Sequence, residues 1–270
     1  TIAGTLVSFF ILIVYQRICN KPIPALAPRE YRPFTLVAKG KVSHDTKKFR
    51  LLFPQGTTYL GLGTGQHLYL KYKDEDNKDV SRPYTPVTGN DTFEYMDLVI
   101  KIYKDGKMGP GKMGNYLDNM KLGETILVRG PSGKLIYKGN GLFSIKDKTT
   151  GKYHDRRFKK VGMISGGTGI TPCLSIIRDM ALQKDSTKIS LIFANQSESD
   201  ILCRTELEAY EKANKNFHLH YTLDRPNEDW KYSKGFVNDT MIQEHLPAPA
   251  SDSLILMCGP PPMIKFACLP

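Results

Sequence analysis

Three short motifs, spaced along the 270 residues, constrain the fold of this chain more than any other feature. They are Arg82-Pro83-Tyr84-Thr85-Pro86, then Gly166-Gly167-Thr168-Gly169-Ile170-Thr171-Pro172, then Cys258-Gly259-Pro260-Pro261-Pro262-Met263. The second and third directly follow short apolar runs, and a glycine-rich turn between a strand and a helix lets backbone N–H groups approach a phosphate. Each motif alone also fits an ordinary turn, but their order and placement favour a nucleotide-binding protein.

The second half of the chain alternates between apolar runs typical of strands and stretches typical of helices. This alternation indicates βαβ units, so we expect a doubly wound parallel sheet at residues 161–270. In such a sheet the carboxyl ends of the strands form the edge that binds the ligand. The expected strands are 161–165, 189–194, 217–223 and 254–257, and the expected helices are 172–182, 204–215 and 238–245.

The first half shows strand-like runs separated by glycine-rich turns. Partial alternation of apolar and polar residues is typical of antiparallel strands with one buried face, so we expect an all-β barrel or sandwich at residues 31–140. The polar, basic residues 141–160 are expected to be a linker and surface loop. The expected strands are 34–39, 48–53, 66–72, 93–103 and 124–129, with one short helix at 115–120.

An excess of basic residues, 38 Lys+Arg against 27 Asp+Glu, gives a formal net charge of +11. A positive field attracts acidic proteins, anionic surfaces or nucleic acid. The basic residues are spread along the chain without a nucleic-acid motif, which disfavours nucleic acid. The five cysteines show no CxxC pair and no zinc-ligand spacing, so the sequence favours a reducing compartment over a disulfide scaffold or a metal site.

The amino-terminal residues 1–19 are expected to be a membrane anchor, followed by an extended, proline-containing linker at 20–30. Residues 1–16 carry no charge, and Arg17 and Lys21 follow the apolar run. The run is slightly short for a spanning helix of about 20 residues, and the flanking bases favour a cytoplasmic location for the domains that follow. A secretory signal cleaved near 25–27 and a buried core helix are the alternatives.

Taken together, the three motifs resemble the flavin and nicotinamide-nucleotide sites of the ferredoxin-NADP reductase superfamily, and within it the NADH-cytochrome b5 reductase family. The resemblance covers nearly all of residues 31–270 and extends to Gly130-Pro131-Ser132-Gly133 and Gly235-Phe236-Val237. It implies a Greek-key barrel that binds FAD, followed by a domain that binds NADH. The family's second domain continues with a further strand beyond Met263, so we expect the carboxyl-terminal end to be missing here.

By this resemblance, the first motif and a second phosphate element, Gly111-Lys112-Met113-Gly114, hold FAD. Arg82 binds the pyrophosphate, Tyr84 packs on the isoalloxazine ring, and Gly114 replaces the family's serine. An edge strand with an ordinary surface arginine, and the upstream copy Gly106-Lys107-Met108, are the alternatives. The residues implied to contact FAD are Arg82, Pro83, Tyr84, Thr85, Val99, Lys101, Gly111, Lys112, Met113, Gly114 and Thr171.

NADH is implied to lie between the second and third motifs. Asp224, after the expected strand 217–223, accepts the ribose hydroxyls and repels the extra phosphate of NADPH, although Arg225 partly offsets this repulsion. Cys258 lies beside the nicotinamide, or is an ordinary buried cysteine after a strand. The residues implied to contact NADH are Gly166, Gly167, Thr168, Gly169, Asn195, Asp224, Cys258, Gly259 and Pro260.

Four residues are implied to act at the reacting centre: Thr85, His44, Thr171 and Cys258. Thr85 hydrogen-bonds near the flavin N5, and His44 resembles a family position in a hydrogen-bond network towards Thr85. Thr171 approaches the flavin from the second domain. A plain surface or core histidine and a helix cap are the alternatives for His44 and Thr171.

The resemblance implies that a hydride passes from NADH to FAD and that electrons then pass singly to the acidic haem protein cytochrome b5. We expect a monomer without metal or nucleic acid, anchored in the endoplasmic reticulum or outer mitochondrial membrane with its catalytic domains facing the cytoplasm. A sister NAD(P)H-dependent ferric or quinone reductase would share the motifs, and a membrane-tethered basic binding module with vestigial cofactor sites is the alternative of another class. The lysines expected to suit an acidic acceptor are Lys47, Lys48, Lys112, Lys159 and Lys160.

Overall fold

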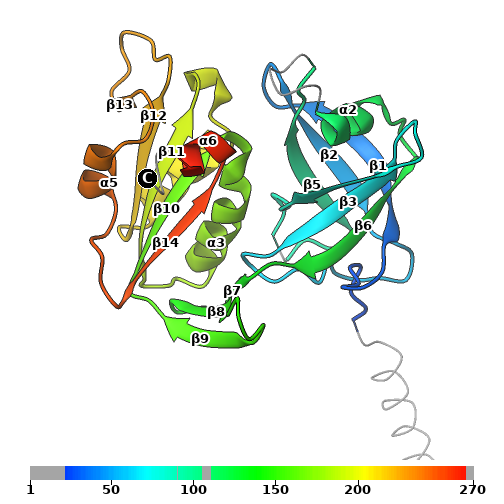
Figure 1. Cartoon of the computed structure of the whole chain (residues 1–270), viewed down its shortest axis with the longest axis horizontal. Coiled ribbons are helices and arrows are strands. Elements are labelled where there is room, and N and C mark those ends of the chain that lie inside the picture. Colours follow the sequence, from blue (N-terminus) through cyan, green and yellow to red (C-terminus); the bar gives the residue numbers. More distant parts are fainter. Residues whose placement is uncertain (1–21, 90, 105–110, 266–270) are drawn as a thin grey trace, which may run out of the picture.

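Residues 22–265, apart from residue 90 and residues 105–110, are described by the computed structural model of this chain. They form two domains that lie side by side, with a small third sheet below them in the view of Figure 1. The expected anchor at 1–19, the alternative phosphate element at 106–108 and residues 266–270 fall outside this part. Among the described residues, no helix is both long enough and apolar enough to cross a membrane.

The first domain is the antiparallel domain expected from the sequence. Its strands are β1 (Arg32–Lys41), β2 (Thr46–Leu52), β3 (His67–Lys73), β4 (Asp79–Tyr84), β5 (Tyr95–Lys101) and β6 (Thr125–Ser132), with helix α2 (Lys112–Asn119). The strand order is β4-β3-β6-β1-β2-β5, and inward side chains such as Phe49 and Leu98 fill one core. The backbone N–H of Val87, just after β4, donates to the carbonyl of Asp97 in β5 at 2.9 Å. The two edges of the sheet therefore approach each other.

Strand β4 was not expected, because its polar residues show no clear alternation. It pairs with β3 in the register Leu70 opposite Arg82 and Leu68 opposite Tyr84. Pro83 lacks a backbone N–H, which an edge strand tolerates and a central strand does not. The first three residues of the first motif therefore lie on an edge strand, which is the backbone conformation named in the alternative of an edge strand with a surface arginine.

The described part of the expected linker at 20–30 packs on the first domain. Ala25 and Leu26 are buried, and their backbone N–H groups donate to the carbonyls of Tyr59 and Leu60 at 2.8 and 3.1 Å. Ala25 and Leu26, between Pro24 and Pro28, pack in the core of the first domain. The extended tether that we expected is therefore wrong from residue 24 onward, where the chain pairs with Tyr59.

The second domain is a five-stranded parallel sheet with the order β13-β12-β11-β10-β14, which confirms the expected α/β architecture. The strands are β10 (Lys160–Gly166), β11 (Lys188–Asn195), β12 (Phe217–Leu223), β13 (Ser233–Lys234) and β14 (Ser253–Cys258). The helices are α3 (Ile170–Leu182), α4 (Arg204–Ala213), α5 (Asp239–His245) and α6 (Pro261–Met263), with the 3-10 turns η1 (Gly167–Gly169) and η2 (Glu198–Asp200). Side chains of α3 and α4 pack on one face of the sheet, and those of α5 pack on the other.

The residues between the domains are not the irregular linker that we expected at 141–160. They form a three-stranded antiparallel sheet of β7 (Leu135–Tyr137), β8 (Leu142–Lys146) and β9 (Tyr153–Arg157). Phe143 buries this sheet against the second domain, whereas every residue of β9 is exposed. A solvent-facing edge strand has the polar composition of a loop, which is why its sequence did not reveal it.

A cavity of about 620 Å³ lies at the amino-terminal ends of the parallel strands, away from the three motifs. On its wall the rings of His220 and His245 stack with their centroids 3.5 Å apart. Burial and, as the smaller cause, the charge of His245 together lower the pKa of His220 from 6.5 to about 4. The native protein therefore resists protonation at this position.

We expect the protein to lose stability as the pH falls from 6.5 towards 4, because unfolded His220 takes up a proton that native His220 excludes. His220→Gln should reduce this loss. Burial also lowers the pKa of His67, so His67 should account for part of the loss that remains. Thermal unfolding across this pH range measures the effect. The exposed His218, on the same strand, provides the control His218→Gln, and an equal loss in both variants would contradict the assignment.

Candidate active site

The second and third motifs meet at the carboxyl edge of the parallel sheet. Strands β10 and β14 are hydrogen-bonded neighbours with Ser165 opposite Cys258. A Cβ atom on Gly169 would lie 2.2 Å from the carbonyl oxygen of Cys258, and one on Gly166 would lie 2.8 Å from the side chain of Pro260. Only glycine allows the two turns to approach this closely, so both motifs border the same crevice.

The turn η1 leads directly into α3, which begins at Ile170 rather than at the expected 172. No side chain caps the amino terminus of α3. The Thr171 hydroxyl instead donates to the carbonyl of Thr168 at 3.2 Å, and Thr171 is buried, so it is not a helix cap. The start of α3 leaves backbone N–H groups at the positive end of a 13-residue helix, which suits an anion.

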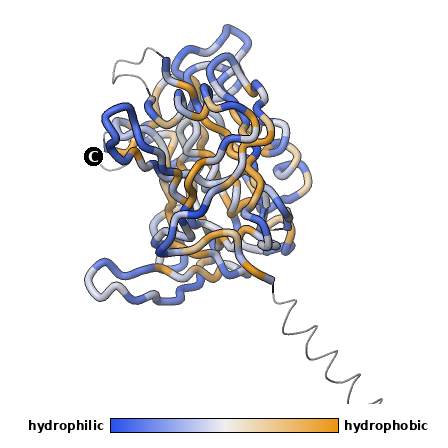
Figure 2. Tube along the Cα trace, turned by 90° about the vertical axis from the view of Figure 1, so that its right-hand side faces the viewer, coloured by the Kyte–Doolittle hydropathy of each residue, from blue (hydrophilic) through white to orange (hydrophobic). Residues whose placement is uncertain are grey.

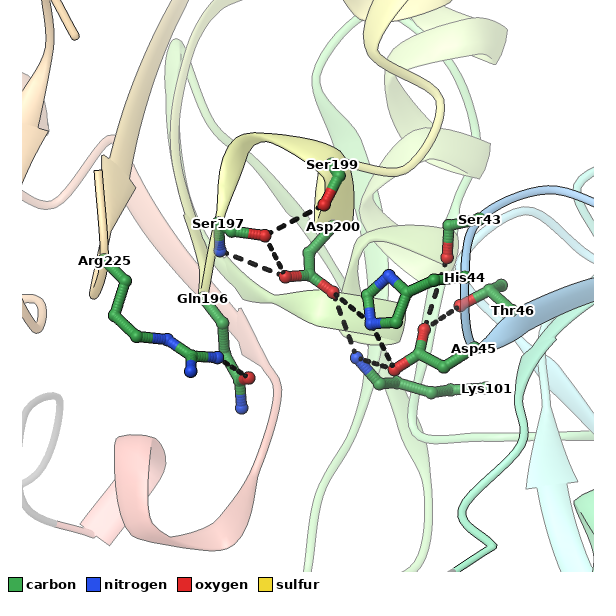
Figure 3. Close-up of polar contacts among 10 residues, drawn as sticks. All are labelled: Ser43, His44, Asp45, Thr46, Lys101, Gln196, Ser197, Ser199, Asp200 and Arg225. Atoms are coloured by element: carbon green, nitrogen blue, oxygen red, sulfur yellow. Dashed lines mark hydrogen bonds and ion pairs between the residues drawn. The ribbon is translucent and has the colours of Figure 1, made fainter. Parts of the chain in front are cut away.

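The neighbouring strands add two polar turns to this edge. The backbone N–H of Asp224 donates to the carbonyl of Asn195 at 3.0 Å, and the Arg225 guanidinium donates to Gln196 Oε1 at 2.8 Å (Figure 3). Burial raises the pKa of Asp224, and the charge of Arg225 counteracts this effect. The Asn195 side chain is 6% exposed, and neither its Nδ2 nor its Oδ1 has a hydrogen-bond partner. Because an unpaired buried amide is costly, Asn195 is a good candidate to bind a ligand here.

Phe236 is a residue of this edge to which the sequence analysis gave no role. Its side chain is 78% exposed. The N–H of Gly235 donates to the carbonyl of Leu223 at 2.8 Å, which places Phe236 near the end of β12 and thus near Asp224. The signal was present in Gly235-Phe236-Val237, because a large aromatic residue beside a turn glycine at a strand end is available to stack on a base.

The first domain brings its own motif residues towards the second. Strand β5 lies against η1, and Val99 of β5 belongs to the hydrophobic core of the second domain. Arg82 is exposed on β4, and Thr85 is buried just after it. Burial raises the pKa of Tyr84 to about 12, so its phenol stays neutral. Burial likewise raises the pKa of Cys258, and its thiol stays protonated.

The second phosphate element forms the start of α2, three residues before the helix that we expected. Gly111 precedes the helix without a side-chain cap, and Lys112 Nζ lies 3.2 Å from Asp74. A Cβ atom on Gly114 would lie 2.9 Å from the carbonyl oxygen of Lys101. A glycine at 114 therefore lets α2 pack against the backbone of Lys101, which gives a steric reason for the glycine where the resemblance led us to expect serine.

Two of the residues predicted to contact FAD are buried in hydrophobic cores. Val99 and Met113 are 7% and 2% exposed and belong to hydrophobic cores. Pro83 is exposed on β4 and has Tyr69 opposite it on β3. Val99 and Met113 therefore offer a cofactor mainly their backbone atoms.

His44 belongs to a charged cluster between the domains (Figure 3). Its Nε2 lies 3.4 Å from Asp45 and 3.8 Å from Asp200 of the second domain. Lys101 Nζ lies 2.7 Å and 3.3 Å from the same two carboxylates. The ion-pair contacts described for His44 lead across the domain boundary to Asp200, and the expected network towards Thr85 stays a prediction.

Asp200 has two functions in this cluster. One of its oxygens accepts from the N–H and hydroxyl of Ser197 at 3.0 and 2.6 Å, which closes a capping box at η2, and the other faces Lys101 and His44. Burial raises the pKa of Asp200, but the hydrogen bond from Ser197 and the charge of Lys101 outweigh this and lower it. The spacing of His44, Asp45 and Asp200 is one that metal ligands also show, yet the Lys101 ammonium supplies the positive charge between the carboxylates. The sequence Ser197-x-x-Asp200 is typical of a capping box, but we gave it no role from the sequence, and it carries no signal for the second function.

The residues of the two domains together fit two dinucleotide cofactors. The unpaired Asn195 amide and the glycines at the start of α3 suit a nucleotide with a pyrophosphate. On the first domain, Arg82 and the uncapped start of α2 suit a second anion. The geometry therefore provides one anion-binding helix terminus on each domain.

Comparisons with known proteins agree with this geometry. Residues 33–137 match the family "Oxidoreductase FAD-binding domain", and residues 163–269 match "Oxidoreductase NAD-binding domain". NADH-cytochrome b5 reductase 2 of Gallus gallus is 50% identical over 258 residues, covering 93% of this chain and 84% of that protein. NADH-cytochrome b5 reductase 3 of Rattus norvegicus is 46% identical over 271 residues, covering 97% and 90%.

Among solved structures, the cytochrome b5 reductase domain of Ulva prolifera nitrate reductase superimposes with a TM-score of 0.82. It is 37% identical, and the match covers 92% of this chain and 93% of that one. The chain therefore belongs to the NADH-cytochrome b5 reductase family.

Proposed function

We propose that this chain is an NADH-cytochrome b5 reductase, which oxidises NADH through a bound FAD and passes the electrons singly to cytochrome b5. The observation that carries the proposal is the contact of β5 with η1, which brings the FAD-binding domain against the glycine turn of the NAD-binding domain. When bound, FAD supplies the chemistry that converts a two-electron donor into a one-electron donor. The work of the protein is to align the two cofactors.

The second domain holds NADH at its carboxyl edge. Backbone N–H groups at the start of α3 bind the pyrophosphate, and Asn195 uses its unpaired amide for a polar group of the same ligand. Asp224 accepts hydrogen bonds from the adenosine ribose, and exposed Phe236 stacks on the adenine. Cys258 packs beside the nicotinamide from the third motif.

The first domain, which we assign to the Greek-key barrel type, holds FAD. Arg82 and the start of α2 bind its pyrophosphate from two sides. Tyr84 offers a neutral, half-buried ring for packing, and buried Thr85 offers a hydroxyl. Neither side chain has to release or accept a proton for a hydride to pass between the cofactors.

Three of the five lysines expected to suit an acidic acceptor have an acidic neighbour that reduces their net charge. Lys47, Lys48 and Lys112 each lie beside a carboxylate, namely Asp118, Asp97 and Asp74. Lys159 and Lys160 lie at the amino-terminal edge of the other domain. We propose that acceptor docking uses the residual positive charge of the molecule as a whole. We also propose a monomer, anchored through residues 1–19 with its domains facing the cytoplasm, on the endoplasmic reticulum or the outer mitochondrial membrane.

The function is tested by rapid mixing of the FAD-supplemented full chain with NADH. The flavin absorbance should bleach, and cytochrome b5 should restore it at a rate that falls as salt is raised, because screening weakens docking. A protein without flavin absorbance would support the vestigial binding module instead. Faster reoxidation by ferric salts or quinones than by cytochrome b5 would identify a sister reductase.

Asp224→Ser should shift the nucleotide preference towards NADPH. Removing the carboxylate removes its repulsion of the extra phosphate, while Arg225 remains to attract it. We expect the ratio of kcat/KM for NADPH to that for NADH to rise by about tenfold or more, which corresponds to about 1.4 kcal/mol. The exposed Asp229, in the same loop, gives the control Asp229→Ser, and equal ratios in both variants would reject the assignment of Asp224 to the ribose.

Asp200→Asn should weaken the attachment between the domains, because asparagine keeps an acceptor for Ser197 but loses the charge that faces Lys101. We expect the free energy of unfolding, measured by chemical denaturation, to fall by about 1.5–3 kcal/mol, the range for hydrogen bonds to charged groups. Asp76→Asn breaks the exposed pair with Lys78 and should have little effect. If both substitutions cost the same, Asp200 does not tie the domains together.

A further inference from the structure

Positive charge is not spread evenly along the chain, contrary to what we expected from the sequence. It is concentrated in residues 134–159, which we name the basic sheet because they contain β7, β8 and β9. It carries eight basic and two acidic side chains, a net charge of +6 out of +11 for the whole chain. All eight basic side chains are exposed. They are Lys134, Lys138, Lys146, Lys148, Lys152, Arg156, Arg157 and Lys159.

Few of these charges are neutralised locally. Lys138 pairs with Asp155 at 3.0 Å, whereas no ion pair is described for Lys148 or Lys152 at the turn between β8 and β9. Strand β9 is an edge strand with all five residues exposed. An exposed edge with unneutralised lysines is protected from pairing with another strand, but it presents a strong field to an anionic surface.

Hydrogen bonds hold the backbone of the basic sheet at both of its ends. Asp147 Oδ1 accepts from the backbone N–H groups of Thr149 and Thr150 at 3.0 and 2.6 Å, which closes the β8–β9 turn. At the other end, the buried Asp185 of the second domain accepts from the Tyr137 hydroxyl and from the N–H of Gly141. The sheet is therefore braced on the second domain and is not a flexible loop.

The basic sheet lies at the end of the molecule where the described chain begins. Figures 1 and 2 share their vertical axis, and in both the hydrophilic β8–β9 hairpin and the first described residues lie at the lower end. The preceding sequence contains the apolar run 2–14, followed by Arg17 and Lys21. The glycine turn and α6 lie towards the opposite end of the second domain.

We propose that the basic sheet docks on the surface of an anionic lipid bilayer, beside the point where the amino-terminal segment enters it. The proposal rests on the proposed membrane attachment. A bilayer with anionic headgroups complements the charge, and each basic residue close to such a surface strengthens binding by about fivefold. Docking of this end turns the carboxyl edge of the parallel sheet, with its nucleotide crevice, away from the membrane and towards the solution.

Hydrogen exchange of the full chain in bilayer nanodiscs tests the proposal. Backbone amides of residues 147–157 should exchange several-fold more slowly in nanodiscs that contain phosphatidylserine than in phosphatidylcholine alone, and high salt should remove the difference. The double variant Lys148→Glu with Lys152→Glu should lose the protection and keep its flavin content and its bleaching by NADH in detergent. No difference between the two lipid compositions in the unsubstituted chain would overturn the proposal.

A matched control changes the net charge of the chain by the same amount, at lysines outside the basic sheet. Lys78→Glu with Lys121→Glu alters two exposed lysines of the first domain, one between β3 and β4 and one just after α2, and should keep the lipid-dependent protection. Loss of protection in both double variants would mean that only total charge matters, which overturns a defined docking surface. Slower reduction of cytochrome b5 in detergent, seen only in the Lys148/Lys152 variant, would assign the surface to the acceptor instead.

The same experiment separates failure of the anchor from failure of the sheet. A chain that does not co-purify with nanodiscs refutes attachment through residues 1–19. Such a chain is then mixed with phosphatidylserine vesicles, where protection of residues 147–157 would support docking without an anchor. Absence of protection there would overturn the docking surface as well.

Discussion

The close approach of two backbone turns at one edge of the parallel sheet is the constraint on which the site depends. The carbonyl of Cys258 occupies the space where a side chain on residue 169 would begin. This contact fixes β14 beside η1, and η1 in turn lies against β5 of the first domain. The steric requirement for glycine therefore shapes the turn of the second domain against which β5 of the first domain lies.

Electrostatic contacts complement this steric arrangement. The Lys101 ammonium lies between Asp45 on its own domain and Asp200 on the other, and His44 lies beside the same carboxylates. Burial disfavours the charged form of Lys101, but its hydrogen bond to Asp45 and the two negative charges outweigh this and raise its pKa. A charged side chain that is half-buried between the domains, and satisfied from both, specifies their orientation as well as their contact.

The sequence predicted those features that depend on local pattern. The antiparallel and parallel domains, and the meeting of the second and third motifs, follow from strand periodicity and from the rule that parallel strands end at one edge. Strands β4 and β9 were missed because an edge strand exposed to solvent has no apolar face to alternate. The function of Asp200 between the domains was missed because it depends on contacts with residues about a hundred positions away, which no local pattern records. The burial of Met113 was missed because a motif match identifies a residue but not the direction of its side chain.

Strand β5 belongs to both hydrophobic cores. Leu98 and Ile100 point into the core of the first domain, whereas Val99, between them, packs in the core of the second. Because adjacent side chains of β5 pack in different cores, displacing this strand would expose apolar surface in both domains. The packing of Val99 therefore couples the stability of the first domain to that of the second.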